Sequence, residues 1–328
     1  MMRHFLLISI LMQPLMLWGA QNVRLAADEW PPFTGQEGQH HIAQDLVAHA
    51  LDRAGLRLTV SIGPWKRALS AVQDSRVDGL VAVWRTERRA TLLLFSRPVL
   101  ENRIHAVTSR QRQIKIASLA DLRRRVVCKT SAYAYGDAID TAAVKGVVES
   151  PTDRQGLDGL LAGDCEVLLI DELSLRYLLE DRPASQQEQV QVQARLASRQ
   201  LRFAMSRQHA QAIDIVRAFD TAIGEMMADG TYNRILDLPW LVVSDGSDGH
   251  TLVPGPGASA LDEPSSQDVY PVVGEESPAL DSKRRVYLVN GRQYESWGDA
   301  KQAIIDDAQT DRADPLVQET RYEIGVPF

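Results

Sequence analysis

Short apolar segments that alternate with amphipathic segments constrain the fold of this chain more than any other feature. Residues 79–83 and 166–170 are almost continuously apolar, and patterns with one apolar face, such as the one over 42–54, lie between such segments. Strands that are apolar on both sides are typical of a parallel sheet covered by helices on both faces. The sequence therefore predicts an α/β fold, in which ligands bind at the carboxyl ends of the strands.

The first 20 residues differ in character from the rest of the chain. Arg3 and His4 precede an apolar segment, and the small residues Gly19 and Ala20 end it. A basic start, an apolar segment too short to span a bilayer and small residues behind it are typical of a secretory signal peptide. We expect residues 1–20 to direct export, and the alternative is an uncleaved membrane anchor.

Charge and motif content argue against several functional classes. The 328 residues carry a formal net charge of −7, and an acidic chain without a basic stripe does not favour nucleic acid as a partner. The histidines are scattered, and His41 and His49 lack the spacing of metal ligands. Nucleophile elbows, phosphate loops and zinc-protease motifs are absent from the sequence. We expect no metal, no cofactor and no enzymatic activity.

The sequence contains two cysteines, Cys128 and Cys165. An even number of cysteines in an exported chain favours one disulfide, and the alternative is a pair of buried thiols. Both residues flank predicted strands of one sheet, so their Cα atoms can approach closely enough for a bond. We expect a disulfide between them.

The composition changes in the last third of the chain. Residues 244–284 are rich in Gly, Pro, Ser and Asp and predict a flexible acidic linker. Residues 285–328 show a hairpin pattern with Asn290-Gly291 at the turn, a helical pattern over 297–307 and a strand pattern near 319–324. They predict a small α+β module with the order ββαβ.

Five motifs in the first two thirds of the chain occur in a characteristic order. They are Asp28-Glu29-Trp30-Pro31-Pro32-Phe33, Pro64-Trp65-Lys66-Arg67-Ala68-Leu69, Thr86-Glu87-Arg88-Arg89 followed by Phe95-Ser96 and Pro98, Asp171-Glu172, and Ala228-Asp229-Gly230-Thr231-Tyr232. From about Val23 to Leu238 the chain thereby resembles the bacterial extracellular solute-binding proteins of polar amino acid uptake systems.

The resemblance implies a two-lobed periplasmic-binding-protein type II fold that closes on a ligand in the cleft between its lobes. Lobe 1 would comprise residues 21–109 and 201–243, and lobe 2 residues 110–200. The protein would be a periplasmic monomer that binds a small carboxylated polar ligand, such as an amino acid or a derivative, for an ABC transporter in the membrane.

Two other functions stay open at this point. The first is an enzyme similar to periplasmic cyclohexadienyl dehydratases, in which Arg89 would bind the substrate carboxylate and Glu172 would be the general acid. The second is a ligand-sensing or envelope-interaction protein. The predicted linker and C-terminal module favour this second function, because a protein that serves uptake alone needs neither.

The resemblance also implies roles for individual residues. Arg89 aligns with the arginine that binds the ligand's α-carboxylate, and a guanidinium suits this role because it stays charged and donates two parallel hydrogen bonds. Its alternative is a solvated surface charge. Asp171 aligns with the aspartate that pairs with the α-ammonium, and its alternative is to cap the helix that begins at Glu172. Trp30 and Trp65 align with aromatic residues that stack on the ligand, and their alternative is ordinary packing.

The sequence departs from the family pattern at two places. Ala82-Val83-Trp84 stands where serines or threonines usually precede the arginine, and Thr130-Ser131-Ala132-Tyr133 replaces a glycine-threonine turn. Side-chain donors are therefore fewer, although the backbone amides of the turn are still available to a carboxylate. The ligand-binding residues expected from the resemblance are Trp30, Trp65, Trp84, Arg89, Ser131, Tyr133 and Asp171.

Overall fold

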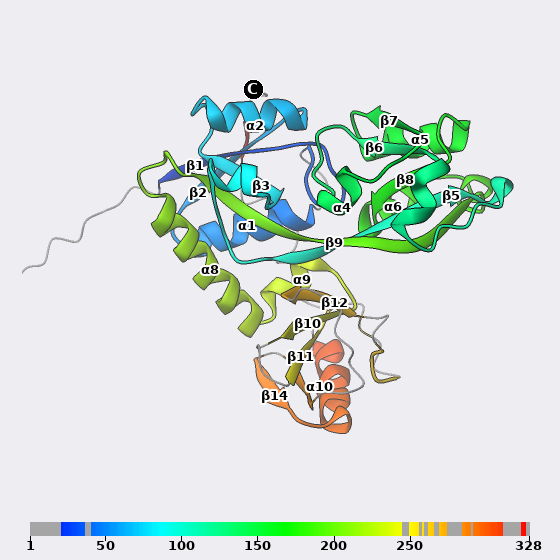
Figure 1. Ribbon diagram of the computed structural model, residues 1–328. Helices are drawn as coiled ribbons and strands as arrows, with labels where there is room; N and C mark the ends of the chain where they lie inside the picture. The colour runs from blue at the N-terminus through cyan, green and yellow to red at the C-terminus, as the bar shows by residue number, and fades with distance from the viewer. Residues whose placement is uncertain are drawn as a thin grey trace, which may run out of the picture.

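The computed structural model describes residues 21–36, 41–244, 249–255, 258, 262–265, 269–273, 284–289, 291–310 and 323–325. The predicted signal peptide over 1–20 lies outside these residues. The described chain forms a large mixed sheet with helices packed against it and a second, smaller sheet (Figure 1). The predicted α/β class is confirmed.

Three parallel strands form the first part of the large sheet. Strand β1 (Asn22–Ala27) lies between β2 (Arg57–Ile62) and β3 (Gly79–Trp84). Helix α1 (Ile42–Arg53) and helix α2 (Trp65–Gln73) pack on opposite sides of these strands (Figure 1). Every residue of β3 is buried because both of its faces are covered, and this explains its continuous apolar sequence.

Two long strands connect the two ends of the large sheet. Strand β9 (Val190–Ser206) pairs with β3 and β4 (Leu93–Phe95) near its carboxyl end and with β5 (Leu100–Ser109) along the rest of its length. Figure 1 shows β9 running from one end of the molecule to the other. We propose that these are the crossing strands at which the two predicted lobes meet.

The second part of the sheet continues from β5. Strand β8 (Val167–Asp171) pairs antiparallel with β5, and β6 (Val126–Thr130) pairs parallel with both β8 and β7 (Gly146–Ser150). The helices of this part are α4 (Asp137–Asp140), α5 (Asp153–Ala162), α6 (Glu172–Glu180) and α7 (Ala184–Gln187), with short 3-10 helices η1 (Arg110–Arg112) and η2 (Leu119–Arg124).

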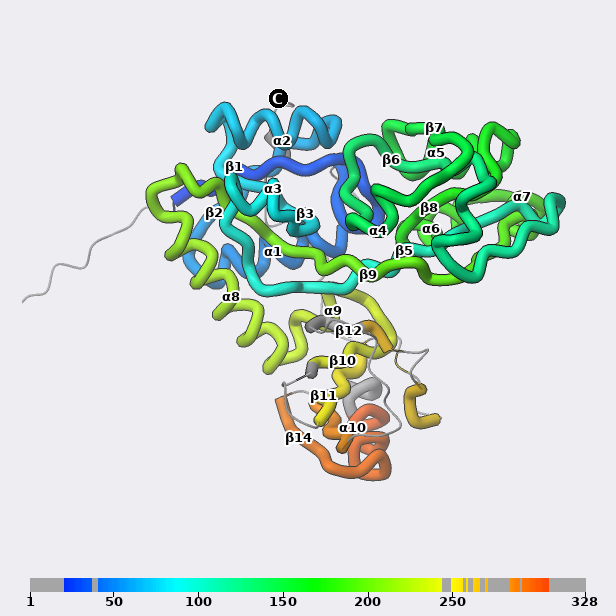
Figure 2. The backbone as a smooth tube through the Cα atoms, viewed as in Figure 1, coloured from blue at the N-terminus to red at the C-terminus, as the bar shows by residue number. Residues whose placement is uncertain are grey.

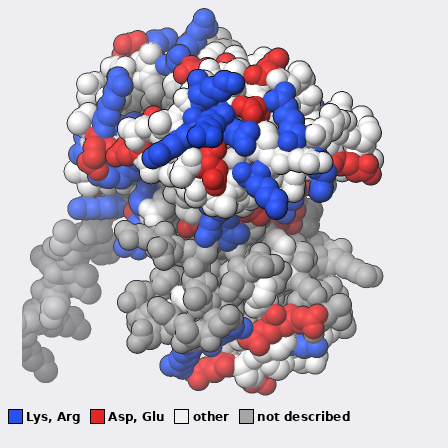
Figure 3. Space-filling view, turned by 45° about the vertical axis from the view of Figure 1, so that its right-hand side comes forward, with Lys and Arg blue, Asp and Glu red and all other residues white. Residues whose placement is uncertain are grey.

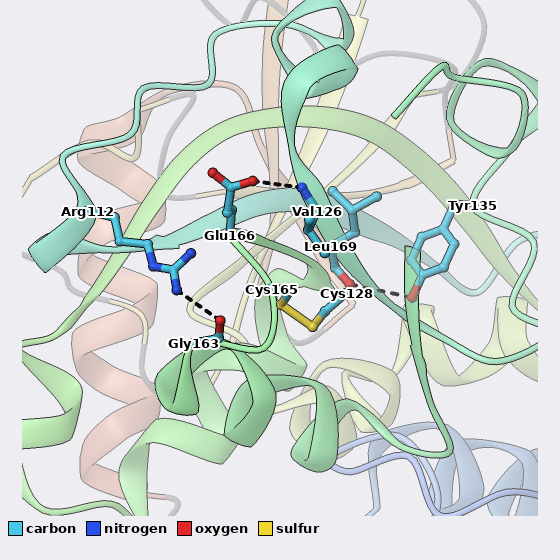
Figure 4. Close-up of a disulfide and its surroundings, with 8 residues drawn as sticks. All are labelled: Arg112, Val126, Cys128, Tyr135, Gly163, Cys165, Glu166 and Leu169. Atoms are coloured by element: carbon cyan, nitrogen blue, oxygen red, sulfur yellow. Dashed lines mark hydrogen bonds between the residues drawn. A yellow bond between two sulfur atoms is a disulfide. The ribbon is translucent and has the colours of Figure 1, made fainter. Parts of the chain in front are cut away.

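The predicted disulfide between Cys128 and Cys165 is present (Figure 4). Cys128 lies in β6 and Cys165 just precedes β8, and their Cα atoms are 5.7 Å apart. The neighbouring strands are also held by Glu166, whose carboxylate accepts a 2.9 Å hydrogen bond from the backbone N–H of Val126. Both sulfur-bearing side chains are fully buried, so the bond joins two strands inside a closed core.

Helices α8 (Ala212–Ala228) and α9 (Thr231–Leu236) pack against α1. Gly230 separates them with φ of +80°, a conformation that favours glycine. Tyr232 is buried, and its hydroxyl donates a hydrogen bond to the carbonyl of Val99, just before β5. In the described parts of the chain, no helix is long and apolar enough to cross a membrane.

A five-stranded sheet and one helix form a unit that we call the C-terminal module. Its strand order is β12 (Val269–Val273), β10 (Trp240–Ser244), β11 (Gly249–Pro254), β13 (Arg284–Val289) and β14 (Arg292–Tyr294), and its helix is α10 (Trp297–Thr310). The predicted hairpin and helix are present as β13, β14 and α10.

The expectation of a flexible linker over 244–284 is wrong for β11 and β12. Leu252 and Val269 from these strands are buried in one cluster with Trp240 and Tyr287. The Gly- and Pro-rich composition belongs to the connections, whereas the short strands between them are apolar and pair with β10 on both of its sides. The module therefore begins at Trp240 rather than at residue 285.

The predicted strand near 319–324 also has a different partner from the one expected. Strand β15 (Glu323–Gly325) pairs parallel with β2, at the edge of the large sheet. The predicted ββαβ order of the module is wrong in this respect, because the last strand joins the part of the chain that was expected to form lobe 1.

The C-terminal module lies beside strand β5 (Figure 2). On β5, Arg103 donates a 2.5 Å hydrogen bond from Nη2 to the carbonyl of Val269, and its guanidinium lies 4.2 Å from the ring centroid of Tyr270. The module thus contacts the strand that joins the two parts of the large sheet.

Figure 3 shows basic and acidic side chains side by side on the face that it displays, so this face carries charges of both signs.

Candidate functional site

A cavity lies at the carboxyl ends of the parallel strands. It is lined by Asp28, Trp30, Trp65, Ala82, Val83, Trp84, Arg89 and Tyr133. Trp30 follows β1, Trp84 ends β3, and Tyr133 follows β6. The location agrees with the position of ligand sites in α/β sheets.

Four aromatic rings lie together at this cavity, and we call them the aromatic box: Trp30, Trp65, Trp84 and Tyr133. The Tyr133 ring centroid is 5.6 Å from those of Trp30 and Trp84 and 6.3 Å from that of Trp65. All three pairs meet edge to face, a favourable arrangement of ring quadrupoles. Tyr133 therefore lies among tryptophans that come from a distant part of the sequence.

Hydrogen bonds within the protein fix the three indole rings. Trp30 Nε1 donates a 3.1 Å hydrogen bond to Asp153 Oδ2. Trp65 Nε1 donates a 3.2 Å hydrogen bond to the Ala132 carbonyl, and Trp84 Nε1 donates a 2.7 Å hydrogen bond to Asn102 Oδ1. Because these polar N–H groups already have partners, the tryptophans present mainly ring carbon atoms to the cavity.

Arg89 brings a positive charge to the cavity. It lies in α3 (Glu87–Ala90), which Thr86 caps by accepting a hydrogen bond from the Arg89 N–H. Its Nη1 donates a 2.8 Å hydrogen bond to the Trp84 carbonyl, and its Nη2 donates a 3.4 Å hydrogen bond to the Ala132 carbonyl. The guanidinium also lies 5.0 Å from the centroid of the Trp65 ring. These partners orient the guanidinium without neutralising it.

The charge of Arg89 has no direct counter-ion among the residues that the structure describes. Burial lowers the pKa of Arg89 to about 10, and the positive charge of Arg199 contributes to the shift. The side chain is therefore still protonated at neutral pH. Within the described residues Arg89 forms no salt bridge. A ligand carboxylate would provide the missing negative charge through charge-assisted hydrogen bonds.

Two buried carboxyl groups lie at or behind the aromatic box. Asp28 lines the cavity and accepts a 2.8 Å hydrogen bond from the Tyr133 hydroxyl, and burial raises its pKa to about 6 against the opposing effect of this bond. Asp153 lies behind Trp30 and accepts a 2.5 Å hydrogen bond from Thr130 Oγ1. Burial also raises the pKa of Asp153 to about 6.

The family model of bacterial extracellular solute-binding proteins, family 3, matches residues 23–240. The chain belongs to this family. The matched range contains every residue of the cavity and ends at the first residue of the C-terminal module.

Solved structures with the same fold include binding proteins and sensors. A histidine kinase sensor domain with similarity to periplasmic binding proteins is 21% identical, with a TM-score of 0.59 over 66% of this chain and 94% of the other. An ancestral arginine-binding protein bound to arginine is 19% identical, with a TM-score of 0.56 over 65% and 96% of the two chains.

A third solved structure is the GluR0 ligand-binding core from Nostoc punctiforme in complex with L-glutamate. It is 17% identical, with a TM-score of 0.57 over 66% of this chain and 97% of the other. A comparison with curated protein sequences finds no match. The similarity to solved structures shows the fold, and it confirms the predicted periplasmic-binding-protein architecture.

Five of the seven predicted ligand-binding residues of this solute-binding protein line its cavity. They are Trp30, Trp65, Trp84, Arg89 and Tyr133. Ser131 does not line it, and its hydroxyl donates a 3.0 Å hydrogen bond to Glu149 Oε2. The neighbouring Ala132 has φ of +61°, in the left-handed region, and this conformation brings its carbonyl to Trp65 and Arg89.

Asp171 does not line the cavity either. Its Oδ1 accepts hydrogen bonds from the N–H groups of Leu173 (2.9 Å) and Ser174 (3.2 Å), and its Oδ2 accepts one from the N–H of Arg103 (2.9 Å). It thus caps α6, which is the alternative to the ammonium-binding role. Burial raises the pKa of Asp171 to about 7.

Glu172, the candidate general acid, lies beside the C-terminal module. Its Oε2 is 3.6 Å from Arg103 Nη1 and 3.6 Å from His105 Nε2. Burial alone would raise its pKa, but hydrogen bonds from His105 and Tyr270 and the charge of Arg103 lower it to about 2. Among the described residues, no group of three or more His, Cys, Asp or Glu side chains is arranged to hold a metal ion.

Sequence analysis missed Asp28 and Asp153 as members of the site. Asp28 stands directly after β1, at the carboxyl end where ligands bind, so its position alone was a usable signal. Asp153 follows the helix-capping Thr152 and offered no such signal, since an acidic residue in the first turn of a helix is common for local reasons.

Proposed function

We propose that this solute-binding protein binds a small zwitterion in the periplasm, with the ligand's carboxylate at Arg89, and delivers it to a membrane transporter. One observation carries the proposal: the guanidinium of Arg89 lines the cavity, is charged at neutral pH and, within the described part of the chain, donates hydrogen bonds only to backbone carbonyls. A carboxylate there would gain two charge-assisted hydrogen bonds and cancel a partly desolvated charge.

The contacts across the cavity support a cleft that closes on its ligand. The Tyr133 hydroxyl donates to Asp28, and the Ala132 carbonyl accepts from Trp65 and Arg89. These bonds join residues more than 40 positions apart in the chain. We propose that these bonds separate when the cleft opens. We also propose that a ligand carboxylate replaces the Ala132 carbonyl at Arg89, because this hydrogen bond, at 3.4 Å, is longer than the 2.8 Å hydrogen bond to the Trp84 carbonyl.

The contacts of Glu172 support a binding function rather than a dehydratase-like reaction. A general acid must hold a proton at the working pH and lie within reach of the substrate. Glu172 has a pKa of about 2 and does not line the cavity, so it satisfies neither condition. We therefore propose that the cleft binds its ligand without transforming it.

The C-terminal module favours ligand sensing as a second candidate function. Arg103 in crossing strand β5 contacts both Val269 and Tyr270 of the module. A movement of the crossing strands on closure would therefore reach the module directly. Slower amide exchange over 269–273 when ligand is added would support sensing, whereas unchanged exchange there would leave transport as the function.

A matched ligand series tests the proposed function. Isothermal titration calorimetry at neutral pH would compare small zwitterions with their carboxamides, which keep the size and the cationic end but lose the negative charge. We expect a zwitterion to bind and its carboxamide to lose about 3 kcal/mol, because the guanidinium would be left without a counter-charge. Equal affinity for both members of each pair would contradict the proposal.

A further inference from the structure

The proposed position of the carboxylate leaves the other end of the ligand to be assigned. Arg89 and Asp28 both line the cavity, together with the aromatic box. These two opposite charges match a zwitterion, because a simple cation would be repelled by Arg89 and a simple anion by Asp28. The cationic end of the ligand therefore belongs beside Asp28 and the aromatic rings.

The cavity offers few acceptors to a primary ammonium group. An ammonium carries three N–H donors, and each donor that is buried without an acceptor is unfavourable. Of the described residues that line the cavity, Asp28 is the one with a carboxylate, and it already accepts the Tyr133 hydroxyl. Ala82 and Val83 are apolar, and the indole N–H groups are donors.

The usual second acceptor is also missing from the cavity. Asp171, which aligns with the ammonium-binding aspartate, accepts three backbone N–H groups and caps α6 outside the cavity. The Trp84 carbonyl already accepts a 2.8 Å hydrogen bond from Arg89. A primary ammonium would therefore depend on Asp28, the Tyr133 hydroxyl and a displaced Ala132 carbonyl for its three donors, whereas the aromatic rings offer it no acceptor.

We propose that the cationic end of the ligand is an N-methylated ammonium, so that the ligand is a compact betaine. This inference rests on the proposed function. A fully methylated ammonium has no N–H donor, and its positive charge spreads over methyl groups that favour the faces of aromatic rings. The aromatic box contacts the methyl groups, Asp28 balances the charge, and Arg89 binds the carboxylate.

The size of the cavity limits the length of this betaine. The cavity is small, with a lining of eight residues, and it does not reach the ~300–1,000 Å³ of pockets that hold drug-sized molecules. We therefore expect a ligand with only one or a few carbon atoms between its two charges. Trimethylglycine and N,N-dimethylproline are probes of this class.

A methylation series tests the inference by calorimetry on the mature full-length chain. Glycine, dimethylglycine and trimethylglycine are compared at pH 7.5, and proline is compared with N,N-dimethylproline. We expect affinity to rise with methylation, by tenfold or more between the first and last member of a series. Equal or tighter binding of the unmethylated members overturns the inference and leaves the proposed function intact.

A pair of variants tests whether the aromatic box is responsible. Trp65→Leu should lower the affinity for the methylated probe tenfold or more, whereas Trp297→Leu, which changes a tryptophan of the C-terminal module, should leave it unchanged. If Trp65→Leu does not fold, the series on the unaltered protein decides alone. Absence of binding by both methylated probes overturns the inference, and the carboxamide comparison then decides separately whether the proposed function holds.

Discussion

Ligand affinity should fall when the pH is lowered through the pKa of Asp28. Burial raises this pKa to about 6, and the carboxylate lines the cavity. The ionised form balances the ligand's positive charge, so ligand binding is linked to loss of the proton. The affinity is therefore fully present well above pH 6 and is lost as the pH falls below it.

The size of the effect follows from the pKa. With a value of about 6, the group is about 97% ionised at pH 7.5 and about 9% ionised at pH 5, which corresponds to an affinity about tenfold lower at pH 5. The probe is trimethylglycine, whose ammonium cannot lose a proton. Arg89, with a pKa of about 10, and Tyr133, with a pKa well above its usual range, keep their protonation states between these pH values.

Asp28→Asn and Asp153→Asn separate the two buried carboxyl groups, because Asp153 also has a pKa of about 6. In Asp28→Asn the affinity should be lower at pH 7.5 and nearly constant down to pH 5. Asp153→Asn, which alters a group behind Trp30 rather than in the cavity, should keep the tenfold decrease. Constant affinity of the unaltered protein, or the same decrease in Asp28→Asn, would refute the reasoning.

Two further predictions concern stability. Replacing Cys128 and Cys165 by serine opens a loop with a sequence separation of 37, so the free energy of unfolding should fall by about 4 kcal/mol. The melting temperature should then fall by roughly 6 °C, and a calorimetric shift below about 1 °C would contradict this. Truncation at Ser244 exposes Trp240 and Val242, which are 2% and 1% exposed, and each contributes about 1.5–3 kcal/mol by burial. The truncated protein should melt several degrees lower or aggregate, and an unchanged melting curve would show that the C-terminal module is independent.

The resemblance to the family predicted most of the cavity, and local signals in the sequence agree with it. Trp30, Trp84 and Tyr133 follow or end apolar strands, and the carboxyl ends of parallel strands converge at one edge of a sheet. Arg89 lies in a short helix just behind such a strand. The resemblance to the family predicted that these residues share a site, and the strand pattern agrees with it.

Asp171 shows where local signals become ambiguous. An aspartate between a strand and a helix suits a ligand site and a helix cap equally well. The choice depends on which groups surround the carboxylate in space, and here these are three backbone N–H groups, including that of Arg103, 68 positions away. No spacing in the sequence shows this contact.

The C-terminal region was misread for a related reason. Short strands β11 and β12 gain their stability from pairing with β10 and from burial against Tyr287, not from their own composition. β15 likewise pairs with β2, which is more than 250 positions away. Pairing between such distant segments cannot be predicted from local composition, and the glycine and proline residues of this region favoured a linker instead.

A double-mutant cycle at Arg89 tests the central claim most directly. Calorimetry would measure a zwitterion and its carboxamide with the unaltered protein, with Arg89→Leu and with the matched control Arg88→Leu, whose arginine is the exposed neighbour in the same helix. We expect Arg89→Leu to lower affinity for the zwitterion by about 3 kcal/mol and to abolish the preference for zwitterion over carboxamide. Arg88→Leu should retain the affinity for the zwitterion and the preference for the zwitterion over the carboxamide. An Arg89→Leu protein that still prefers the zwitterion would show that the carboxylate binds elsewhere.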